Sequence, residues 1–193
     1  MKKKTLEEEV AQIKQRMNIV SEEKKNHKYE YGCAMLYFDL PDIKKIHEII
    51  DPKDVYSEEG YGLETEPHVT LLFGLHDGVS VPQVTEVMDK FKYTDCILYN
   101  ASLFKNPQYD VLKFDIRYPT KGGAFLHKTN AELSKFPHTT DYPDYHPHCT
   151  IGYLKSGTGE KYVKELNDRE FVVTPEYGVY TTTNGDKNRI KIN

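Results

Sequence analysis

Two short stretches of this chain share one pattern: EPHVTLLFGL at residues 66–75 and HPHCTIGYL at residues 146–154. Each contains a proline, a histidine, one further residue and a threonine, followed by an apolar run with a glycine in it. Short apolar runs bounded by polar segments are typical of buried strands. One Pro-His-x-Thr sequence would be a weak signal, but two, each leading into an apolar strand, are rarely incidental. We therefore expect the two stretches to play equivalent parts in one site.

The predicted elements around these stretches occur in the same order twice. A strand, a helix, the His-x-Thr strand, a helix and a further strand can be followed through each half of the chain. Asn184-Gly185 is a strong hairpin signal between the last two strands. Strands are expected at 31–40, 66–75, 95–104, 110–118, 146–154, 169–174, 177–183 and 188–192, and helices at 41–50, 81–91, 122–136 and 159–168. The order indicates an α+β protein with two similar lobes, each contributing one His-x-Thr strand.

Composition limits the function classes. Of the 193 residues 38% are hydrophobic and 29% charged, as in ordinary soluble globular proteins. The formal net charge of −4 disfavours a protein that coats duplex nucleic acid, because such binding rests on many Lys and Arg contacts to phosphates. We find neither a membrane-length apolar run nor the apolar core of a signal peptide, so we expect a cytoplasmic protein with no membrane partner.

Residues 1–28 differ from the rest of the chain. Apolar residues recur there every three or four positions with charges between them, which predicts an amphipathic helix. These residues are Leu6, Val10, Ile13, Met17 and Val20. The helix either packs on its own domain or joins copies of the chain in a homo-oligomer, and the spacing alone leaves both open. Residues 29–193 are expected to form a single domain of two lobes.

The three cysteines, Cys33, Cys96 and Cys149, are odd in number and widely spaced. No pair of them has zinc-ligand spacing, so we interpret all three as buried thiols.

Strand geometry predicts which side chains face the site. Successive side chains of a strand alternate between faces, so His68 and Thr70 share one face, and His148 and Thr150 share one face of their own strand. The same alternation places Tyr153 on the opposite face and excludes it from the site. Gly74 and Gly152, in the two apolar runs, leave room for the close approach of a ligand or of another backbone.

Two imidazoles and two hydroxyls suit one kind of chemistry. If the strands lie side by side, one histidine can act as a general base and the other as a general acid. The threonine hydroxyls can donate hydrogen bonds to the non-bridging oxygens of a phosphate. This arrangement suits in-line transfer at a phosphodiester without a metal. A zinc or manganese site is a sharper alternative than incidental histidines, but no helical His-x-x-x-His pair supports it. Its ligands would come from His76, Asp77, Asp144, His146 and His148.

These motifs resemble those of a known family, the two-histidine (2H) phosphoesterases, which are defined by two His-x-Thr/Ser motifs. PHVTLLFG and PHCTIGYL match that pattern, and the resemblance covers most of residues 31–193. It implies a bilobal α+β fold with pseudo-twofold-related lobes whose antiparallel sheets line a central cleft. It also implies that His68 and His148 are the acid–base pair, that Thr70 and Thr150 position the phosphate, and that no cofactor is needed.

Within that family, one branch is more similar. YGCAMLYFD, EPHVTLLFGLHD and HPHCTIGYLKSGTGEKY resemble stretches of phage anti-CBASS phosphodiesterases, which open cyclic di- and trinucleotide signals of bacterial antiphage defence. The resemblance implies a metal-independent enzyme in the cytoplasm of the host cell, with Tyr31 stacking on a nucleobase. An RNA 2′,3′-cyclic or 2′-5′ phosphodiesterase and a non-catalytic cyclic-nucleotide sponge are the alternatives.

Further substrate contacts are expected from side chains near the motifs. Lys155 and Lys161 follow the second motif and can offset phosphate charge, while Glu176 and Tyr177 are candidates for base contacts. Two tyrosines in the loop before the second motif are candidates for a lid; they are Tyr142 and Tyr145.

Overall fold

The computed structural model describes residues 29–58, 60–119, 123–142 and 144–193. The amphipathic helix expected at 1–28 lies outside the described residues, and so does the choice left open for it between packing on its own domain and joining copies of the chain. No helix among the described residues is both long enough and apolar enough to cross a membrane.

The observed elements follow the expected order closely. They are β1 (Gly32–Asp39), α2 (Ile43–Glu48), a 3-10 turn (Pro52–Asp54), β2 (His68–Leu75), α3 (Val81–Asp89), β3 (Cys96–Lys105), β4 (Tyr109–Arg117), α4 (Phe125–Leu133), β5 (His148–Lys155), α5 (Glu160–Leu166), β6 (Phe171–Thr181) and β7 (Lys187–Lys191). The Asn184-Gly185 turn joins β6 to β7, as predicted.

One expectation about the late strands was wrong. Residues 169–174 and 177–183 were predicted as two strands, but the chain runs through them as the single strand β6. Pro175 lies between the two predicted strands, and proline lacks the N–H that a strand ladder uses. The strand tolerates it at a bulge, where Phe38 of β1 lies opposite Pro175 and Tyr37 opposite Tyr177, which leaves Glu176 as the extra residue.

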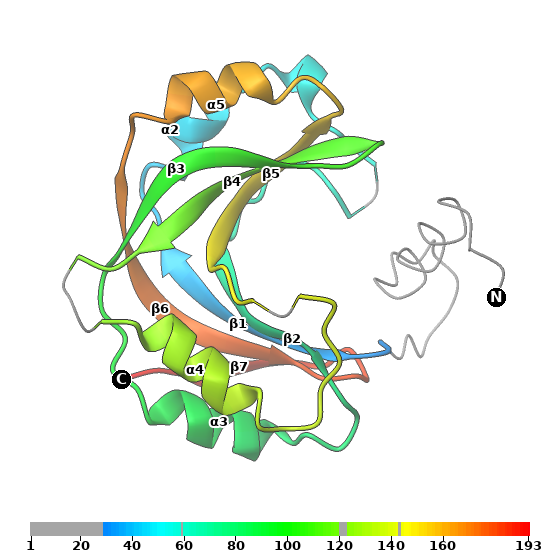
Figure 1. The fold of residues 1–193 in the computed structure, drawn as a ribbon, viewed down its shortest axis with the longest axis vertical. Helices are drawn as coiled ribbons and strands as arrows, with labels where there is room; N and C mark the ends of the chain where they lie inside the picture. The colour runs from blue at the N-terminus through cyan, green and yellow to red at the C-terminus, as the bar shows by residue number, and fades with distance from the viewer. Residues whose placement is uncertain (1–28, 59, 120–122, 143) are drawn as a thin grey trace, which may run out of the picture.

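All the strands form one antiparallel sheet in the order β2-β1-β6-β3-β4-β5, with β7 also paired to β6. The long strand β6 joins the two lobes, because its first residues pair with β3 and its remainder with β1. The sheet curves so strongly that its two end strands, β2 and β5, come together again (Figure 1). These end strands are the two that carry the His-x-Thr motifs.

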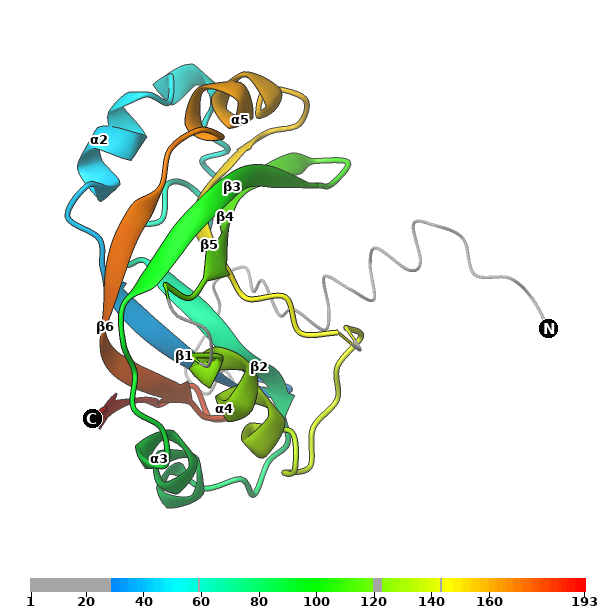
Figure 2. The same cartoon turned by 60° about the vertical axis from the view of Figure 1, so that its left-hand side comes forward.

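The helices cover the outer side of the curved sheet in two groups. Figures 1 and 2 show α2 and α5 at one end of the molecule and α3 and α4 at the other. The buried side of α3 carries Val84, Val87 and Met88, whose spacing predicted the helix. Val69 and Leu71 of β2 point into this core, and α4 packs against that strand. The histidines and threonines alternate with these core residues and therefore lie on the concave face of the sheet.

The cysteines are free thiols. Cys96 and Cys149 are buried, and burial raises the pKa of each thiol to about 12. Cys33 is only partly buried, so the expectation of buried thiols is confirmed for two of the three cysteines.

Candidate active site

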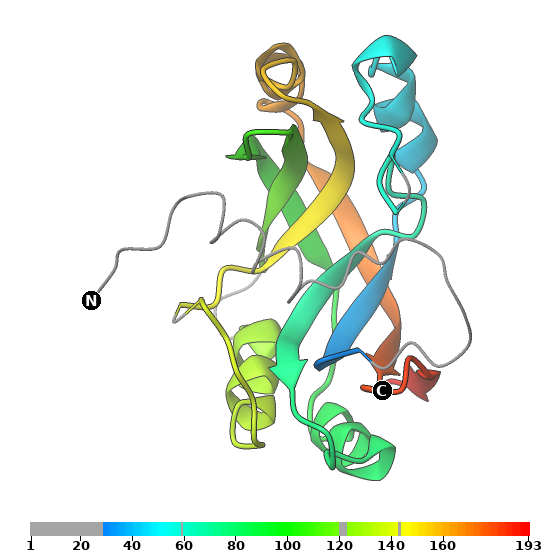
Figure 3. The same ribbon diagram turned by 90° about the vertical axis from the view of Figure 1, so that its right-hand side faces the viewer.

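The two motifs meet at the centre of the molecule. β2 and β5 are in contact and run in opposite directions, with their first residues near one another and their last residues at opposite ends (Figure 3). His68 opens β2 and His148 opens β5, so each strand delivers its histidine to the shared centre. Burial is the main cause of a lowered pKa for His148, and the charge of His68 acts in the same direction.

Both histidines are held in the same way. Nδ1 of His68 lies 2.8 Å from the carbonyl oxygen of Glu66, and Nδ1 of His148 lies 2.9 Å from that of His146. A carbonyl oxygen only accepts hydrogen bonds, so each Nδ1 must carry the hydrogen. The neutral imidazole then has its lone pair on Nε2, which is the nitrogen left for exchanging a proton with a ligand.

His68 has aromatic neighbours. Its ring centroid lies 5.2 Å from that of Tyr37, and Tyr37 stacks on Tyr177 with centroids 5.0 Å apart and rings 7° from parallel. The guanidinium of Arg189 lies 3.6 Å from the Tyr177 ring centroid, which is a close cation–π contact. A carboxylate oxygen of Glu64 lies 3.9 Å from Nδ1 of His68.

His148 has charged neighbours. The Phe104 ring meets the His148 ring edge-on, with 4.9 Å between the ring centroids. The ammonium of Lys113 lies 4.9 Å from the centroid of the same Phe104 ring. Lys113 also pairs with Asp115, which lies opposite His148 in the β4–β5 ladder. Burial lowers the pKa of His148, and Lys113 acts in the same direction, while the carbonyl of His146 and the carboxylate of Asp115 act against them.

Lys113, Asp115 and Phe104 were missed by sequence reasoning. They belong to strands β3 and β4, which carry no repeated motif. Strand alternation would place Lys113 and Asp115 on one face, but only the register of β4 against β5 shows that this face is the one of His148 and Thr150.

The threonines of the two motifs occupy matching places. Thr70 lies opposite Met35 of β1, and Thr150 lies opposite Lys113 of β4. The hydroxyl of Tyr145 donates a hydrogen bond of 3.0 Å to the backbone carbonyl of Thr70. Tyr145 therefore anchors the loop before β5 to β2, whereas Tyr142, the other tyrosine proposed for a lid, is 80% exposed.

A bulge follows each threonine. In β2 the extra residue is Leu71, and in β5 it is Ile151, each directly after the threonine of its motif. A bulge shifts the alternation of all later side chains by one position. The face predicted for Tyr153 was therefore wrong: Tyr153 is part-exposed between two buried residues, on the same face as His148 and Thr150.

Tyr153 lies within a cluster of tyrosines. Its ring centroid is 5.0 Å from that of Tyr61 and 5.6 Å from that of Tyr109, and Tyr56 joins the same group. At the far end of β2, Tyr31 stacks on His76 at 5.8 Å and meets Phe73 edge-on at 6.2 Å. Aromatic side chains thus stand at both ends of the pair of motif strands.

The two glycines allow another backbone to approach. A Cβ on Gly74 would lie 1.8 Å from the carbonyl oxygen of Thr139, and one on Gly152 would lie 2.8 Å from the Leu63 side chain and 3.2 Å from the carbonyl oxygen of Gly62. The sequence left open whether a ligand or another backbone approaches these glycines. The structure shows a loop backbone close to each of them.

Glu176 and Tyr177 line a hollow near His68. The hollow has a volume of about 230 Å³ and lies where β1, β6 and the residues before β2 meet. Its walls include Tyr37, Thr65 and Glu66 besides the two predicted residues. The Tyr37 ring contacts both His68 and Tyr177, so Tyr177 lies one side chain away from His68, and Glu176 lies beside it in the wall of the hollow.

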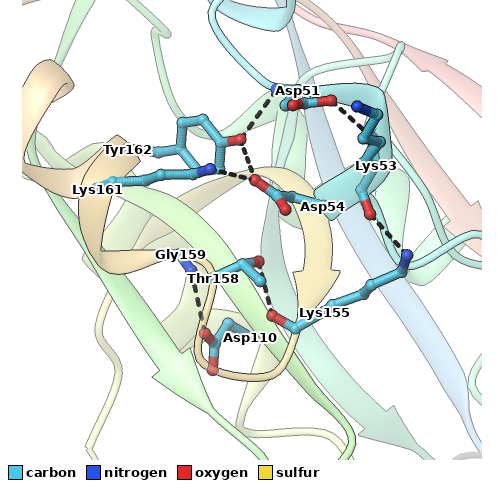
Figure 4. Close-up of polar contacts among 9 residues, drawn as sticks. All are labelled: Asp51, Lys53, Asp54, Asp110, Lys155, Thr158, Gly159, Lys161 and Tyr162. Carbon is cyan, nitrogen blue, oxygen red and sulfur yellow. Dashed lines mark hydrogen bonds and ion pairs between the residues drawn. The ribbon is translucent and has the colours of Figure 1, made fainter.

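The two predicted lysines lie elsewhere. Figure 4 shows the ammonium of Lys155 donating to the carbonyl oxygen of Lys53, at 2.6 Å, and Lys161 paired with Asp54, at 2.5 Å. Lys155 is seven residues beyond His148, about 20 Å along the strand. The structure does not bring either lysine together with the histidines, and their contact with substrate stays a prediction.

The alternative of a metal centre finds no support among the described residues, where no group of three or more His, Cys, Asp or Glu side chains is placed to hold an ion. Two of the proposed ligands have other contacts: His76 bonds to the Thr139 hydroxyl at 2.8 Å, and Asp77 accepts from the Thr183 hydroxyl at 2.8 Å.

The fold is similar to that of proteins with solved structures. Usb1 from Kluyveromyces marxianus superposes with a TM-score of 0.56 over 84% of this chain and 98% of its own, at 10% identity. The fold is similar to that of Usb1. The structure confirms the expected bilobal α+β fold, which is built on one antiparallel sheet.

Two further structures were compared. Usb1 with uridine monophosphate matches with a TM-score of 0.53, at 10% identity, over 84% of this chain and 99% of its own. Escherichia coli LigT complexed with 3′-AMP matches with a TM-score of 0.47, at 15% identity, over 85% and 97%. No family model matches the sequence. No curated protein matches it either.

Proposed function

We propose that this protein is a metal-independent phosphodiesterase that opens small cyclic oligonucleotides of two or three nucleotides. One observation carries the proposal: two histidines from two lobes converge on one centre, and each is held at Nδ1 so that Nε2 is left for proton transfer. A pair of imidazoles, one neutral and one protonated, supplies the base and the acid that in-line displacement at phosphorus requires.

The reaction balances with these groups alone. The attacking oxygen, from a ribose 2′-hydroxyl or from water, forms a bond to phosphorus and passes its proton to Nε2 of one histidine. The bond from phosphorus to the leaving ribose oxygen breaks, and that oxygen takes the proton from Nε2 of the other histidine. The hydroxyls of Thr70 and Thr150 donate to the non-bridging oxygens as charge builds on them. Proton exchange with water restores the starting state.

A small substrate fits the surroundings of the histidines. The hollow of about 230 Å³ beside Tyr37 is of a size to take one nucleobase, with Tyr177 in its wall and Glu176 to accept hydrogen bonds from the amino groups of the base. Tyr31 stands beyond the other end of β2 as a stacking surface for a base. The net charge of −4 favours a short ligand over a long nucleic acid, because a long nucleic acid is bound through many Lys and Arg side chains.

The cyclic substrate class rests on the resemblance of the motif regions to phage anti-CBASS phosphodiesterases. On that basis we propose that the protein removes cyclic nucleotide signals of antiphage defence in the cytoplasm of the host cell. The complex of Usb1 with uridine monophosphate supports the view that a fold of this kind accommodates a nucleotide.

The test is a cleavage assay in excess EDTA. Purified protein is incubated with 3′,3′-cyclic dinucleotides, a cyclic trinucleotide, RNA ending in a 2′,3′-cyclic phosphate, and a 2′-5′-linked oligoadenylate. We expect the cyclic di- or trinucleotides to be opened and a His68→Ala variant to lose that activity. Cleavage of the RNA end or of the 2′-5′ linkage alone would keep the chemistry and replace the substrate. Tight binding of a cyclic nucleotide without turnover would identify a sponge and reject the enzyme.

A further inference from the structure

A lysine is enclosed beside the second motif. Only 8% of Lys113 is exposed, although lysine is almost never buried unless it is paired. Its ammonium pairs with the carboxylate of Asp115 and lies over the ring of Phe104. In the ladder between β4 and β5, Lys113 stands opposite Thr150 and Asp115 opposite His148. The charge is thus next to two of the residues that the motif brings to the site.

The carboxylate that holds Lys113 is itself fixed from a second side. The side-chain amide of Asn100 donates to the other oxygen of Asp115. Asn100 is the extra residue of a bulge in β3 and has a φ of 52°, in the left-handed region that residues other than glycine rarely adopt. Backbone conformations of this kind persist where surrounding contacts hold them, often at functional sites. Asn100, Asp115 and Lys113 therefore form a chain of contacts that ends in an ammonium.

The other lobe shows that the fold does not require this chain. The position equivalent to Lys113, opposite Thr70, holds Met35, and the one equivalent to Asp115, opposite His68, holds Tyr37. The same backbone arrangement, with the same bulge after the threonine, is therefore built in one lobe without an ionic pair. The fold therefore does not need the Lys113 ammonium for packing. Its enclosed position next to the hydroxyl of Thr150 indicates that it binds an anionic ligand.

We infer that Lys113 is a further catalytic group beside the two histidines and two threonines, and that its ammonium donates to the non-bridging phosphoryl oxygen that Thr150 also holds. The inference rests on the proposed function and names the residue that stabilises the charge of its transition state. Displacement at phosphorus concentrates negative charge on the non-bridging oxygens, and a fixed cation in a partly enclosed site lowers the barrier most. Lys113 transfers no proton in this step. Asp115 and Asn100 are positioning residues that hold the ammonium in place.

The first test compares kcat/KM of three variants on the cyclic nucleotide that the wild type opens. Lys113→Met installs the side chain that the other lobe has at this position, so we expect a folded protein with a loss of about 100-fold. Lys113→Arg should recover part of that loss because it restores the charge. Lys164→Met, on the outer helix α5, is the matched control and should equal the wild type. A Lys113→Met variant that is folded and within threefold of the wild type would overturn the inference.

The second test uses phosphorothioate substrates, in which sulfur replaces one non-bridging oxygen. The wild type should discriminate between the Rp and Sp forms, because only one of them places sulfur at the oxygen that Lys113 contacts. Lys113→Met should reduce that discrimination at least tenfold, and Asp115→Asn should reduce it less. An unchanged preference in a weakened Lys113→Met enzyme would assign a structural role to Lys113 and reject a catalytic one.

The two proposals fail in different ways. If the wild type turns over its substrate and Lys113→Met does so at the same rate, the inference fails and the proposed function stands. If the wild type turns over nothing, the proposed function fails, and binding of inorganic phosphate decides the rest. Phosphate affinity at least tenfold lower in Lys113→Met, and unchanged in Lys164→Met, would keep Lys113 as a phosphate ligand. Equal phosphate affinity in both variants would reject it.

Discussion

The two lobes share a backbone but differ in what they place around their histidines. In each lobe the His-x-Thr strand is the last strand at its end of the sheet. Its histidine is hydrogen-bonded to the backbone carbonyl two residues earlier, and a bulge follows its threonine. Around His68 the neighbouring strand supplies Tyr37, whereas around His148 it supplies Lys113 and Asp115. Repeated geometry can thus deliver two identical side chains, while unlike neighbours give them unlike electrostatic surroundings.

The strongest test of the equivalence is to remove each histidine in turn. General acid or base catalysis typically contributes 10²–10⁴-fold, so we expect His68→Ala and His148→Ala each to lower kcat about 1000-fold. The measurement is cleavage of a cyclic dinucleotide in EDTA, with thermal unfolding as the control for folding. A variant that keeps a tenth of the wild-type rate would show that its histidine is not half of an acid–base pair.

The two glycines should differ in their effect on stability. Gly74 has a φ of 101°, and a Cβ there would meet the backbone of Thr139, which cannot turn aside as a side chain can. We expect Gly74→Ala to lower the free energy of unfolding by about 3 kcal/mol. For Gly152→Ala, where the closest atom is the end of the Leu63 side chain, we expect about 1–2 kcal/mol. Urea denaturation measures both, and equal values would contradict the assigned difference.

The aromatic residues at the two ends of the motif strands give a smaller contrast. A base stacked on an aromatic side chain contributes about 1–3 kcal/mol, so we expect Tyr31→Ala to raise KM about tenfold. Tyr153→Ala should raise it less, because Tyr153 packs against Tyr61 and Tyr109 in its own lobe. Initial-rate measurements on one cyclic nucleotide suffice. An equal increase for both variants would show that each lobe stacks a base.

The smallest expected effect is a pH dependence of stability. Burial is the main cause of a lowered pKa for His47, His127 and His148. The unfolded chain then binds protons more readily than the folded one, so the free energy of unfolding should fall as pH drops below about 6.5. Urea denaturation between pH 5 and 7 measures the slope, and His148→Gln should flatten it. A free energy of unfolding that is constant over this range would contradict the prediction.

Much of the fold was predictable from local sequence. Apolar spacing predicted helices at 41–50 and 81–91, where α2 and α3 form, and alternation within each motif placed His68 with Thr70 and His148 with Thr150. These predictions succeeded because side-chain direction in regular structure depends only on position along the chain. Tyr153 and β6 escaped prediction because bulges depend on the pairing with a neighbouring strand, which no local pattern records.

The sequence by itself thus determined which histidine and threonine form each pair, because side chains two residues apart in a strand point to the same face. Only the tertiary structure decided what surrounds them. The curvature of the sheet brings β2 and β5 together from opposite ends of the strand order, and the register of β4 sets Lys113 and Asp115 beside Thr150 and His148. Register and curvature arise from contacts between distant segments, and those contacts exist only once the chain has folded.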